Sequence, residues 1–121
     1  MDACETVLAA LRSIRAPLQR GEYDLHGLVS AALTDAGLPH CHEVRLAPRC
    51  RIDFLCGSVG IEIKRGRTER KRVLEQLARY AACEAVGTLV LVTERNVDLP
   101  ACILGKPVRC VCLNRLWGIA L

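Results

Sequence analysis

The sequence predicts an α/β protein, with a mixed α+β arrangement in which helices cover the faces of one sheet. Two observations support this fold class. The spacing of apolar residues changes from helical to alternating and back along the chain, and the composition, 51% hydrophobic and 25% charged, is that of a globular protein. The 121 residues give room for one domain, residues 1–121, because independent domains usually need about 100–150 residues.

Three helices are predicted from apolar residues at helical spacing. The first covers residues 2 to about 16 and ends before Pro17. The second follows Gly21 and ends at residues 37–39, Gly-Leu-Pro. The third covers residues 68–84, with Thr68 as its N-cap.

The strands are predicted from alternation and from one continuous apolar run. Residues 42–48, 50–56 and 59–64 alternate, and residues 88–93 form an unbroken run typical of a strand covered on both faces. A last strand is predicted at 108–113, after a loop or short helical turn at 99–104. The order α-α-β-β-β-α-β-β indicates an antiparallel meander followed by a right-handed, parallel β-α-β crossover.

The segment 50–64 is predicted to form a hairpin with Gly57-Ser58 as a type II′ turn. This register places Asp53 opposite Glu62 and Arg51 opposite Lys64. Alternation then puts these four charged side chains on one face. The other face is apolar and contains Ile52, Phe54, Cys56, Val59, Ile61 and Ile63.

Two carboxylates opposed across a ladder repel each other, so a positive group is expected between them. Lys64 and Arg51 could fill this role in an ordinary ion-pair cluster on an exposed sheet face. A divalent metal ion is the other interpretation, because hard oxygen ligands on adjacent strands suit Mg²⁺ or Mn²⁺.

The basic residues are unevenly distributed although the net charge is only +4. Six of them follow the hairpin within nine positions, namely Lys64, Arg65, Arg67, Arg70, Lys71 and Arg72. The run indicates a polyanion partner or, alternatively, a solvated helix start. With only four aromatic residues, a base-stacking platform for single strands is poorly supported.

The eight cysteines form no C-x-x-C pair, and free thiols are expected. The nearest set of soft ligands is His40-Cys41-His42 with Cys50, and a metal site there is the less favoured interpretation. No apolar run could cross a bilayer, and residues 1–20 lack a basic segment before their apolar part. We therefore expect a cytoplasmic protein without membrane association, in the host cytoplasm if the chain is phage-encoded.

Asp53, followed after eight residues by Glu62-Ile63-Lys64 and then a helix, resembles the PD-(D/E)XK nuclease superfamily. The resemblance covers roughly residues 21–95 and implies a restriction-endonuclease-like α-β-β-β-α-β core with an extra N-terminal helix and a C-terminal strand. Ile52 stands where the family name expects proline. In the predicted third helix, Gln76 and Tyr80 are similar to the Q-x-x-x-Y motif of the RecB-like and Cas4-like branch, although a glutamine after ExK also occurs in the VRR-type branch.

The resemblance implies a set of site residues. Asp53, Glu62, Lys64 and Gln76 are the implied catalytic residues, and Mg²⁺ or Mn²⁺ would be held by the two carboxylates with the Ile63 carbonyl. A further ligand from the second helix would be Glu22 or, as second choice, His26. A first-turn glutamate favoured by the helix dipole and a partly exposed histidine are the simpler alternatives. A helix-boundary glutamine and a core-edge tyrosine are the simpler reading of Gln76 and Tyr80.

The implied function is metal-dependent hydrolysis of DNA phosphodiester bonds. Backbone contacts would come from Arg51, Arg65, Arg67, Arg70, Lys71, Arg72 and Tyr80, so structure or end selectivity is expected rather than sequence specificity. DNA recombination, repair or phage DNA processing are the implied contexts. A homodimeric Holliday-junction-type resolvase, paired through residues 108–113, and a catalytically silent DNA-binding module stay open. A third alternative is an iron–sulfur relative that uses Cys4, Cys102, Cys110 and Cys112.

Overall fold

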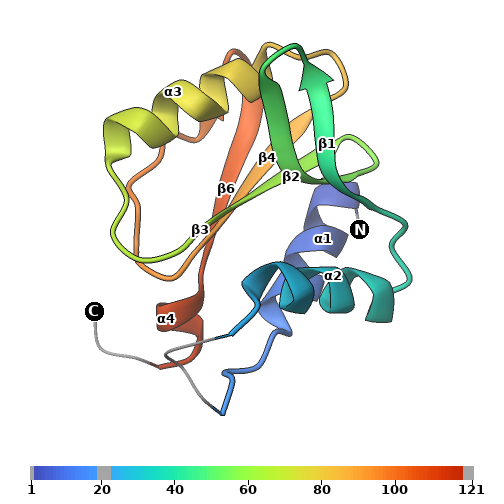
Figure 1. Ribbon diagram of the computed structural model, residues 1–121, viewed down its shortest axis with the longest axis vertical. Helices are drawn as coiled ribbons and strands as arrows, with labels where there is room; N and C mark the ends of the chain where they lie inside the picture. The colour runs from blue at the N-terminus through green and yellow to red at the C-terminus, as the bar shows by residue number, and fades with distance from the viewer. Residues whose placement is uncertain (1, 19–22, 119–121) are drawn as a thin grey trace.

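The computed structural model describes residues 2–18 and 23–118, which form one mixed sheet with helices on both faces (Figure 1). The helices are α1 (Ala3–Arg12), α2 (Leu25–Asp35), α3 (Arg70–Ala81) and α4 (Leu113–Leu116). The strands are β1 (Cys41–Ala47), β2 (Cys50–Cys56), β3 (Val59–Lys64), β4 (Thr88–Thr93), β5 (Cys102–Ile103) and β6 (Lys106–Cys112). The predicted mixed α/β class is confirmed.

The strand order in the sheet is β1-β2-β3-β4-β6-β5. β1, β2 and β3 form an antiparallel meander, and β3-α3-β4 is a parallel crossover, as predicted. β6 then adds parallel to β4, and β5 adds antiparallel to β6. The carboxyl ends of β3 and β4 therefore meet at the same edge of the sheet, where Lys64 is paired with Thr93.

Two apolar layers lie on opposite faces of the sheet. α1 and α2 cover one face, where Leu11 and Val29 join Phe54 and Val90 in a buried cluster. α3 covers the other face, where Leu77 and Tyr80 pack with Leu89 and Leu91. β4 contributes to both clusters, which explains why its sequence is an unbroken apolar run.

Several predicted helix boundaries are wrong by a few residues. α1 ends at Arg12 instead of about residue 16, because Ser13 closes the helix and Pro17 disfavours a helical conformation at the residue before it. α3 begins at Arg70, with Glu69 rather than Thr68 as its N-cap, and ends at Ala81.

The strand predictions for residues 50–56, 59–64 and 88–93 are confirmed, while β1 and β6 are shifted. The predicted loop at 99–104 contains β5, and the predicted end of the last strand belongs to α4. Its first residue, Leu113, is buried, and the Asn114 amide donates to the Glu94 carbonyl at 3.1 Å. No helix in the described ranges 2–18 and 23–118 has the length and apolar character needed to span a bilayer.

The hairpin register is confirmed near the turn, where Phe54 pairs with Ile61 and Cys56 with Val59. Gly57 has φ +61°, which the first central position of a type II′ turn requires. The predicted face of Ile52 is wrong, since Ile52 packs in the α3 layer while Phe54 packs in the α1–α2 layer. Ile52 lies over Gly60, where a Cβ atom would be 2.6 Å from its Cδ1 atom. Alternation in β2 is therefore interrupted at Asp53.

Candidate metal and nucleic-acid site

A pair of carboxylates lies where the β2–β3 ladder is interrupted. Oδ2 of Asp53 accepts a hydrogen bond from the Ile63 amide at 2.8 Å, and Oε1 of Glu62 accepts one from the Asp53 amide at 3.2 Å. Each carboxylate thus binds the backbone of the opposite strand, in place of the backbone pair that would continue the ladder beyond Phe54 and Ile61. Asp53 is half-buried and Glu62 is only 4% exposed.

α3 places an amide and a phenol behind this pair. Nε2 of Gln76 donates to Oε2 of Glu62 at 2.9 Å and lies 2.8 Å from the Tyr80 hydroxyl. That hydroxyl donates to the Arg51 carbonyl at 2.9 Å. Gln76 and Tyr80 are one helical turn apart and share a face. The structure therefore brings the predicted residues Gln76 and Tyr80 to the carboxylate pair.

Lys64 supplies the nearest cation within the described residues. Its Nζ atom lies 3.5 Å from Oε2 of Glu62, with the lysine side chain 28% exposed. Lys64 is two residues after Glu62 on β3, so the strand alternation directs both side chains to the same face. A cation at this position partly balances the two acids and remains accessible to a ligand.

The environment of Glu62 favours its protonated form. Burial, followed by the charge of Asp53, raises the pKa of Glu62 from its ordinary value of 4.5 to about 7, and Lys64 only partly opposes this effect. Burial and the Glu62 carboxylate raise the pKa of Tyr80 as well, so its hydroxyl stays a donor at neutral pH. Perturbation of this kind is common at functional sites, and it marks Glu62 as a group that a cation would stabilise.

Asp53 and Glu62 have the chemistry of a hard-cation site. Among the contacts of the described residues, Oδ1 of Asp53 accepts no hydrogen bond, which leaves this oxygen available to a ligand. Oxygen ligands of this kind suit Mg²⁺ or Mn²⁺, which usually retain several waters. The described residues contain no group of three or more His, Cys, Asp or Glu side chains placed to share a metal ion. Within residues 2–18 and 23–118, the two carboxylates are therefore the side chains that could hold a metal ion there.

Of the two predicted helix ligands, only His26 lies within the described residues. Glu22 lies outside the described residues. His26 is in the first turn of α2, where its Nδ1 atom is 3.0 Å from Nε2 of His42. His26 therefore contacts another histidine and does not form a three-residue group with Asp53 and Glu62.

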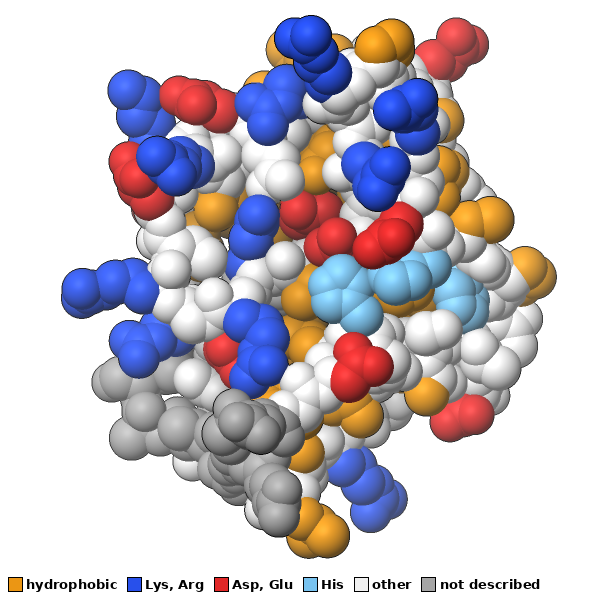
Figure 2. Space-filling view, viewed as in Figure 1, with side chains coloured by type: hydrophobic (Ala, Val, Ile, Leu, Met, Phe, Trp, Pro, Cys, Tyr) orange, Lys and Arg blue, Asp and Glu red, His pale blue; other side chains and the backbone are white. Residues whose placement is uncertain are grey.

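The basic residues near the pair fall into two sets. Arg65 and Arg70 are engaged within the protein, because Arg65 binds Glu94 and Nε of Arg70 donates to the Asp98 carbonyl at 2.8 Å. Arg67, Lys71 and Arg72 are exposed near the start of α3, with Arg72 paired to Glu69. Acidic side chains lie near the centre of one face of the molecule, with Lys and Arg side chains around them (Figure 2).

Arg51 is exposed on β2, and its partner across the β1–β2 ladder is Arg45, which is also exposed. Like charges directly opposite each other destabilise an antiparallel pair. An anion bound between the two arginines would relieve that repulsion.

A second acidic centre at the same sheet edge was not predicted from the sequence. Glu94 follows β4, where Oε1 accepts from the Gly66 amide at 2.6 Å and Oε2 accepts from Nη2 of Arg65 at 3.2 Å. The Tyr23 hydroxyl also donates to Oε2, and the Arg65 guanidinium lies 4.1 Å from the centre of the Tyr23 ring. The sequence did contain a signal for this centre. Glu94 is an acidic residue directly after the buried strand β4, which ends beside β3.

All eight cysteines are free, as expected. Cys4 lies on α1, Cys102 on β5, and Cys110 and Cys112 on β6. Among the described residues, which include all four, they do not form a group of three or more metal-binding side chains. The same holds for the second predicted set, His40, Cys41, His42 and Cys50. The structure thus gives no support to an iron–sulfur cluster held by Cys4, Cys102, Cys110 and Cys112.

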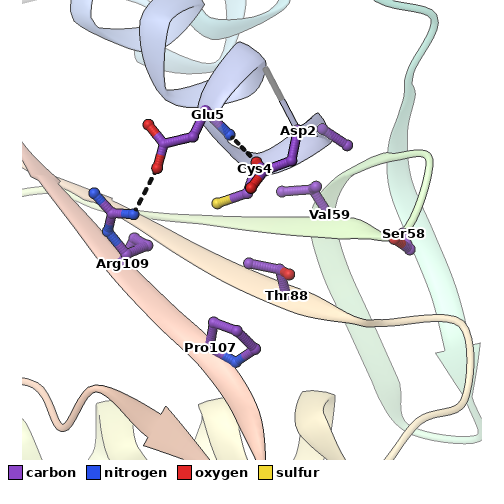
Figure 3. Close-up of a pocket in the computed structure, with 9 residues that line it drawn as sticks. Asp2, Cys4, Glu5, Ser58, Val59, Thr88, Pro107 and Arg109 are labelled. Carbon is purple, nitrogen blue, oxygen red and sulfur yellow. Dashed lines mark hydrogen bonds and ion pairs between the residues drawn. The ribbon is translucent and has the colours of Figure 1, made fainter.

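A cavity of about 420 Å³ lies away from the carboxylates, against α1 at the starts of β3, β4 and β6. Figure 3 shows Cys4 and Glu5 of α1 facing Arg109 of β6 across it, with the Glu5–Arg109 ion pair at 3.0 Å. Val59 on its wall belongs to the α1–α2 layer, whereas Glu62 contacts α3. The cavity and the carboxylate pair are therefore separate features on opposite faces of the sheet.

Comparisons of the chain with profiles of known families, with curated proteins and with solved structures found no significant match.

Proposed function

We propose that the protein is a Mg²⁺- or Mn²⁺-dependent deoxyribonuclease that hydrolyses DNA phosphodiester bonds. The observation that carries this proposal is the Asp53–Glu62 pair at the interrupted β2–β3 ladder, with Lys64 at 3.5 Å and Gln76 at 2.9 Å from Glu62. Two acids, a lysine and an amide in one accessible site form a set suited to metal-assisted phosphoryl chemistry.

Asp53 and Glu62 would hold the cation, with the Ile63 carbonyl as a third oxygen. The bound ion would supply positive charge next to the scissile phosphate and lower the pKa of a coordinated water. Glu62 is suited to exchange its proton for this ion, because burial and Asp53 raise its pKa to about 7. At neutral pH a dication therefore competes with a proton for Glu62.

Lys64 and Gln76 would act on the reacting groups. The Lys64 ammonium is 28% exposed and can donate to the attacking water or to a phosphate oxygen on which charge develops. Gln76 is fixed between Glu62 and Tyr80, so its amide keeps the Glu62 carboxylate in one orientation. Tyr80, by donating to the Arg51 carbonyl, joins α3 to β2 and acts as a positioning residue.

Binding of DNA would use the backbone phosphates. Arg51 and Arg45 face each other on β2 and β1, and Arg67, Lys71 and Arg72 are exposed beside α3. These residues lie on β1, on β2, in the segment before α3 and on α3, which suits a duplex or branched substrate held across the site. Contacts of this kind read the position of phosphates rather than the bases, so selectivity for structure or ends is expected.

The order α2-β1-β2-β3-α3-β4 supports an assignment to the restriction-endonuclease-like fold and to the PD-(D/E)XK superfamily, with α1 and β6 as additions. Processing of DNA in recombination, repair or a phage life cycle would follow from such an activity. A homodimeric junction resolvase is a specific version of the proposal. β6 offers part of an edge for it, because β5 pairs only with Lys106 and Pro107.

A catalytically silent DNA-binding module is the second candidate function. It is favoured by the fact that Gln76 and Lys64 already contact Glu62, and by the absence of a third His, Cys, Asp or Glu beside the pair within the described residues. In that case the site would bind phosphates through its basic residues without cleaving them.

The test is incubation with supercoiled, linear, single-stranded and four-way-junction DNA in the presence of Mg²⁺, Mn²⁺ or EDTA. We expect metal-dependent cleavage that disappears in Lys64→Ala. DNA binding without cleavage under every metal condition would favour the silent module, and cleavage that is unchanged in EDTA would contradict the proposed chemistry.

A further inference from the structure

The three histidines of the chain surround one buried phenylalanine. His42 stacks on Phe54 with ring centres 4.5 Å apart and planes at 20°, while His26 and His40 lie 5.9 and 5.8 Å from the same ring. His26 belongs to α2 and His42 to β1, so the cluster joins a helix to the outermost strand of the sheet. Figure 2 shows the histidines as a row beside the central acidic side chains.

The hydrogen bonds separate one histidine from the other two. Both ring nitrogens of His40 are engaged, with Nε2 at 3.0 Å from the Ser30 hydroxyl and Nδ1 at 2.9 Å from the Leu38 carbonyl. His26 and His42 instead contact each other, with Nδ1 of His26 at 3.0 Å from Nε2 of His42. Only one proton can occupy that contact, so at least one of the two nitrogens presents a lone pair.

We propose that His26 and His42 form a binding site for a borderline transition-metal dication of the Zn²⁺ or Ni²⁺ class. Neutral imidazole is a preferred ligand of these ions. The site would use two protein nitrogens, with water or an external ligand in the remaining positions. It is distinct from the carboxylate pair, whose hard oxygen donors suit Mg²⁺ or Mn²⁺, and it does not depend on the proposed nuclease function.

The spacing of the nitrogens fits such an ion. Two Zn–N bonds of about 2.0–2.1 Å at angles between a right angle and a tetrahedral angle place the nitrogens roughly 2.9–3.4 Å apart. The observed separation of 3.0 Å lies in this range. A rotation of the imidazole rings, without a shift of α2 against β1, would turn both lone pairs toward one ion.

Access and rigidity also favour the site. His42 is exposed on β1, so an ion reaches the pair from solvent. The stacking of His42 on Phe54, which is fully buried, limits the orientations open to that ring before an ion binds. A ring that is already ordered loses less conformational entropy on binding, which raises affinity for a two-ligand site.

The test is a Zn²⁺ titration of the full chain, followed by NMR of the histidine ring nitrogens and by calorimetry. We expect the signals of Nδ1 of His26 and Nε2 of His42 to shift together at one equivalent of Zn²⁺, while both His40 signals stay in place. His42→Asn, at an exposed position, should remove this binding without unfolding the protein, and His26→Asn should do the same. His40→Asn is the matched control and should retain Zn²⁺ binding.

Two further arms separate this site from others in the molecule. Asp53→Asn should leave the Zn²⁺ response of the two rings intact, and Mg²⁺ should produce none. Unchanged Zn²⁺ affinity in His42→Asn, or Zn²⁺ binding that shifts only signals of cysteine or carboxylate residues, would overturn the proposal. Loss of DNA cleavage would not bear on it, because the ring-nitrogen readout does not depend on activity.

Discussion

Glu62 lies on β3 and Glu94 directly follows the adjacent parallel strand β4, yet their surroundings shift the pKa values of these two glutamates in opposite directions. Burial and the neighbouring Asp53 raise the pKa of Glu62 to about 7. Burial also acts to raise the pKa of Glu94, but the donors from Tyr23, Gly66 and Arg65 outweigh it, and the net pKa is lowered. The groups around Glu62 do not stabilise its charge enough to overcome burial. The hydrogen-bond donors around Glu94 stabilise its charge by more than burial destabilises it.

This difference separates an acid whose charge is satisfied within the protein from one whose charge is not. Glu94 ties β4 to the segment after β3 through the Gly66 amide and Arg65, and these contacts satisfy its charge within the protein. Glu62 is placed next to a second acid, and among the described residues Lys64 is the one cation paired with it, an arrangement that costs stability unless a ligand completes it. A site poised for a cation is expected to look like Glu62 and not like Glu94.

The largest expected effect is on catalysis at the uncompensated site. Asp53→Asn and Lys64→Ala should each reduce the rate of DNA cleavage by about 100-fold or more, because each removes a group that acts on the metal or on developing charge. Cleavage of labelled DNA under single-turnover conditions measures this. Asp35→Asn, an exposed carboxylate at the end of α2, is the matched control and should keep full activity.

The next effect is a difference in stability between the two glutamates. Glu94→Gln should lower the free energy of unfolding by about 2 kcal/mol, since hydrogen bonds to a charged group typically contribute about 1.5–3 kcal/mol. Glu62→Gln should raise it by about 1–2 kcal/mol at pH 8 without metal, because it removes a disfavoured charge. Urea denaturation of the two variants measures both free energies of unfolding. Equal destabilisation by Glu94→Gln and Glu62→Gln would contradict the predicted difference between the two glutamates.

The pH dependence of stability should separate the two acids further. The pKa of Glu62 is raised in the folded state, so its protonated form stabilises the fold at low pH and this contribution is lost as pH rises from about 4.5 to about 7. The pKa of Glu94 is lowered in the folded state. Its ionised form therefore stabilises the fold above the ordinary carboxyl pKa, and this stabilisation is lost as the pH falls through the folded-state pKa of Glu94. The advantage of Glu62→Gln over wild type should therefore grow between pH 5 and 7.5 in thermal melts, as follows from the direction of its pKa shift. A constant difference across that interval would show that Glu62 titrates normally.

The smallest effect concerns the basic residues around the site. Arg51→Ala should lower the slope of the logarithm of DNA affinity against the logarithm of salt concentration by about 0.9, the value for one phosphate contact. Fluorescence anisotropy at several salt concentrations measures the slope. Arg109→Ala, whose guanidinium pairs with Glu5 of α1 beside the separate cavity, is the control and should leave the slope unchanged.

The sequence could predict the parts of the molecule that depend on local pattern. The hairpin turn at Gly57 and the continuous strand Thr88–Thr93 are set by residues close in sequence, and both are observed. The proximity of Asp53 and Glu62 follows from the hairpin register. The resemblance implied Gln76 as a site residue, and the spacing of Gln76 and Tyr80 places both on one face of α3, whereas the contact of Gln76 with Glu62 is seen only in the structure.

Other parts depend on contacts between distant residues and could not be derived from pattern. The interruption of alternation at Asp53 arises because carboxylate side chains replace backbone partners between β2 and β3, which brings Ile52 over Gly60. Strict period-two reasoning cannot detect such an exchange. The pairing of His26 with His42 and the capture of Arg65 by Glu94 likewise join residues far apart in the chain.

The central claim, that the Asp53–Glu62 pair is a divalent-cation site, is tested most directly by carbon NMR of the Glu62 side-chain carboxyl during a pH titration with and without Mg²⁺. The environment of Glu62 predicts a midpoint at about 7 without metal, and a much lower midpoint in saturating Mg²⁺. In Asp53→Asn the midpoint without metal should fall and the response to Mg²⁺ should weaken. A midpoint at the ordinary value for glutamate that Mg²⁺ does not move would contradict the account.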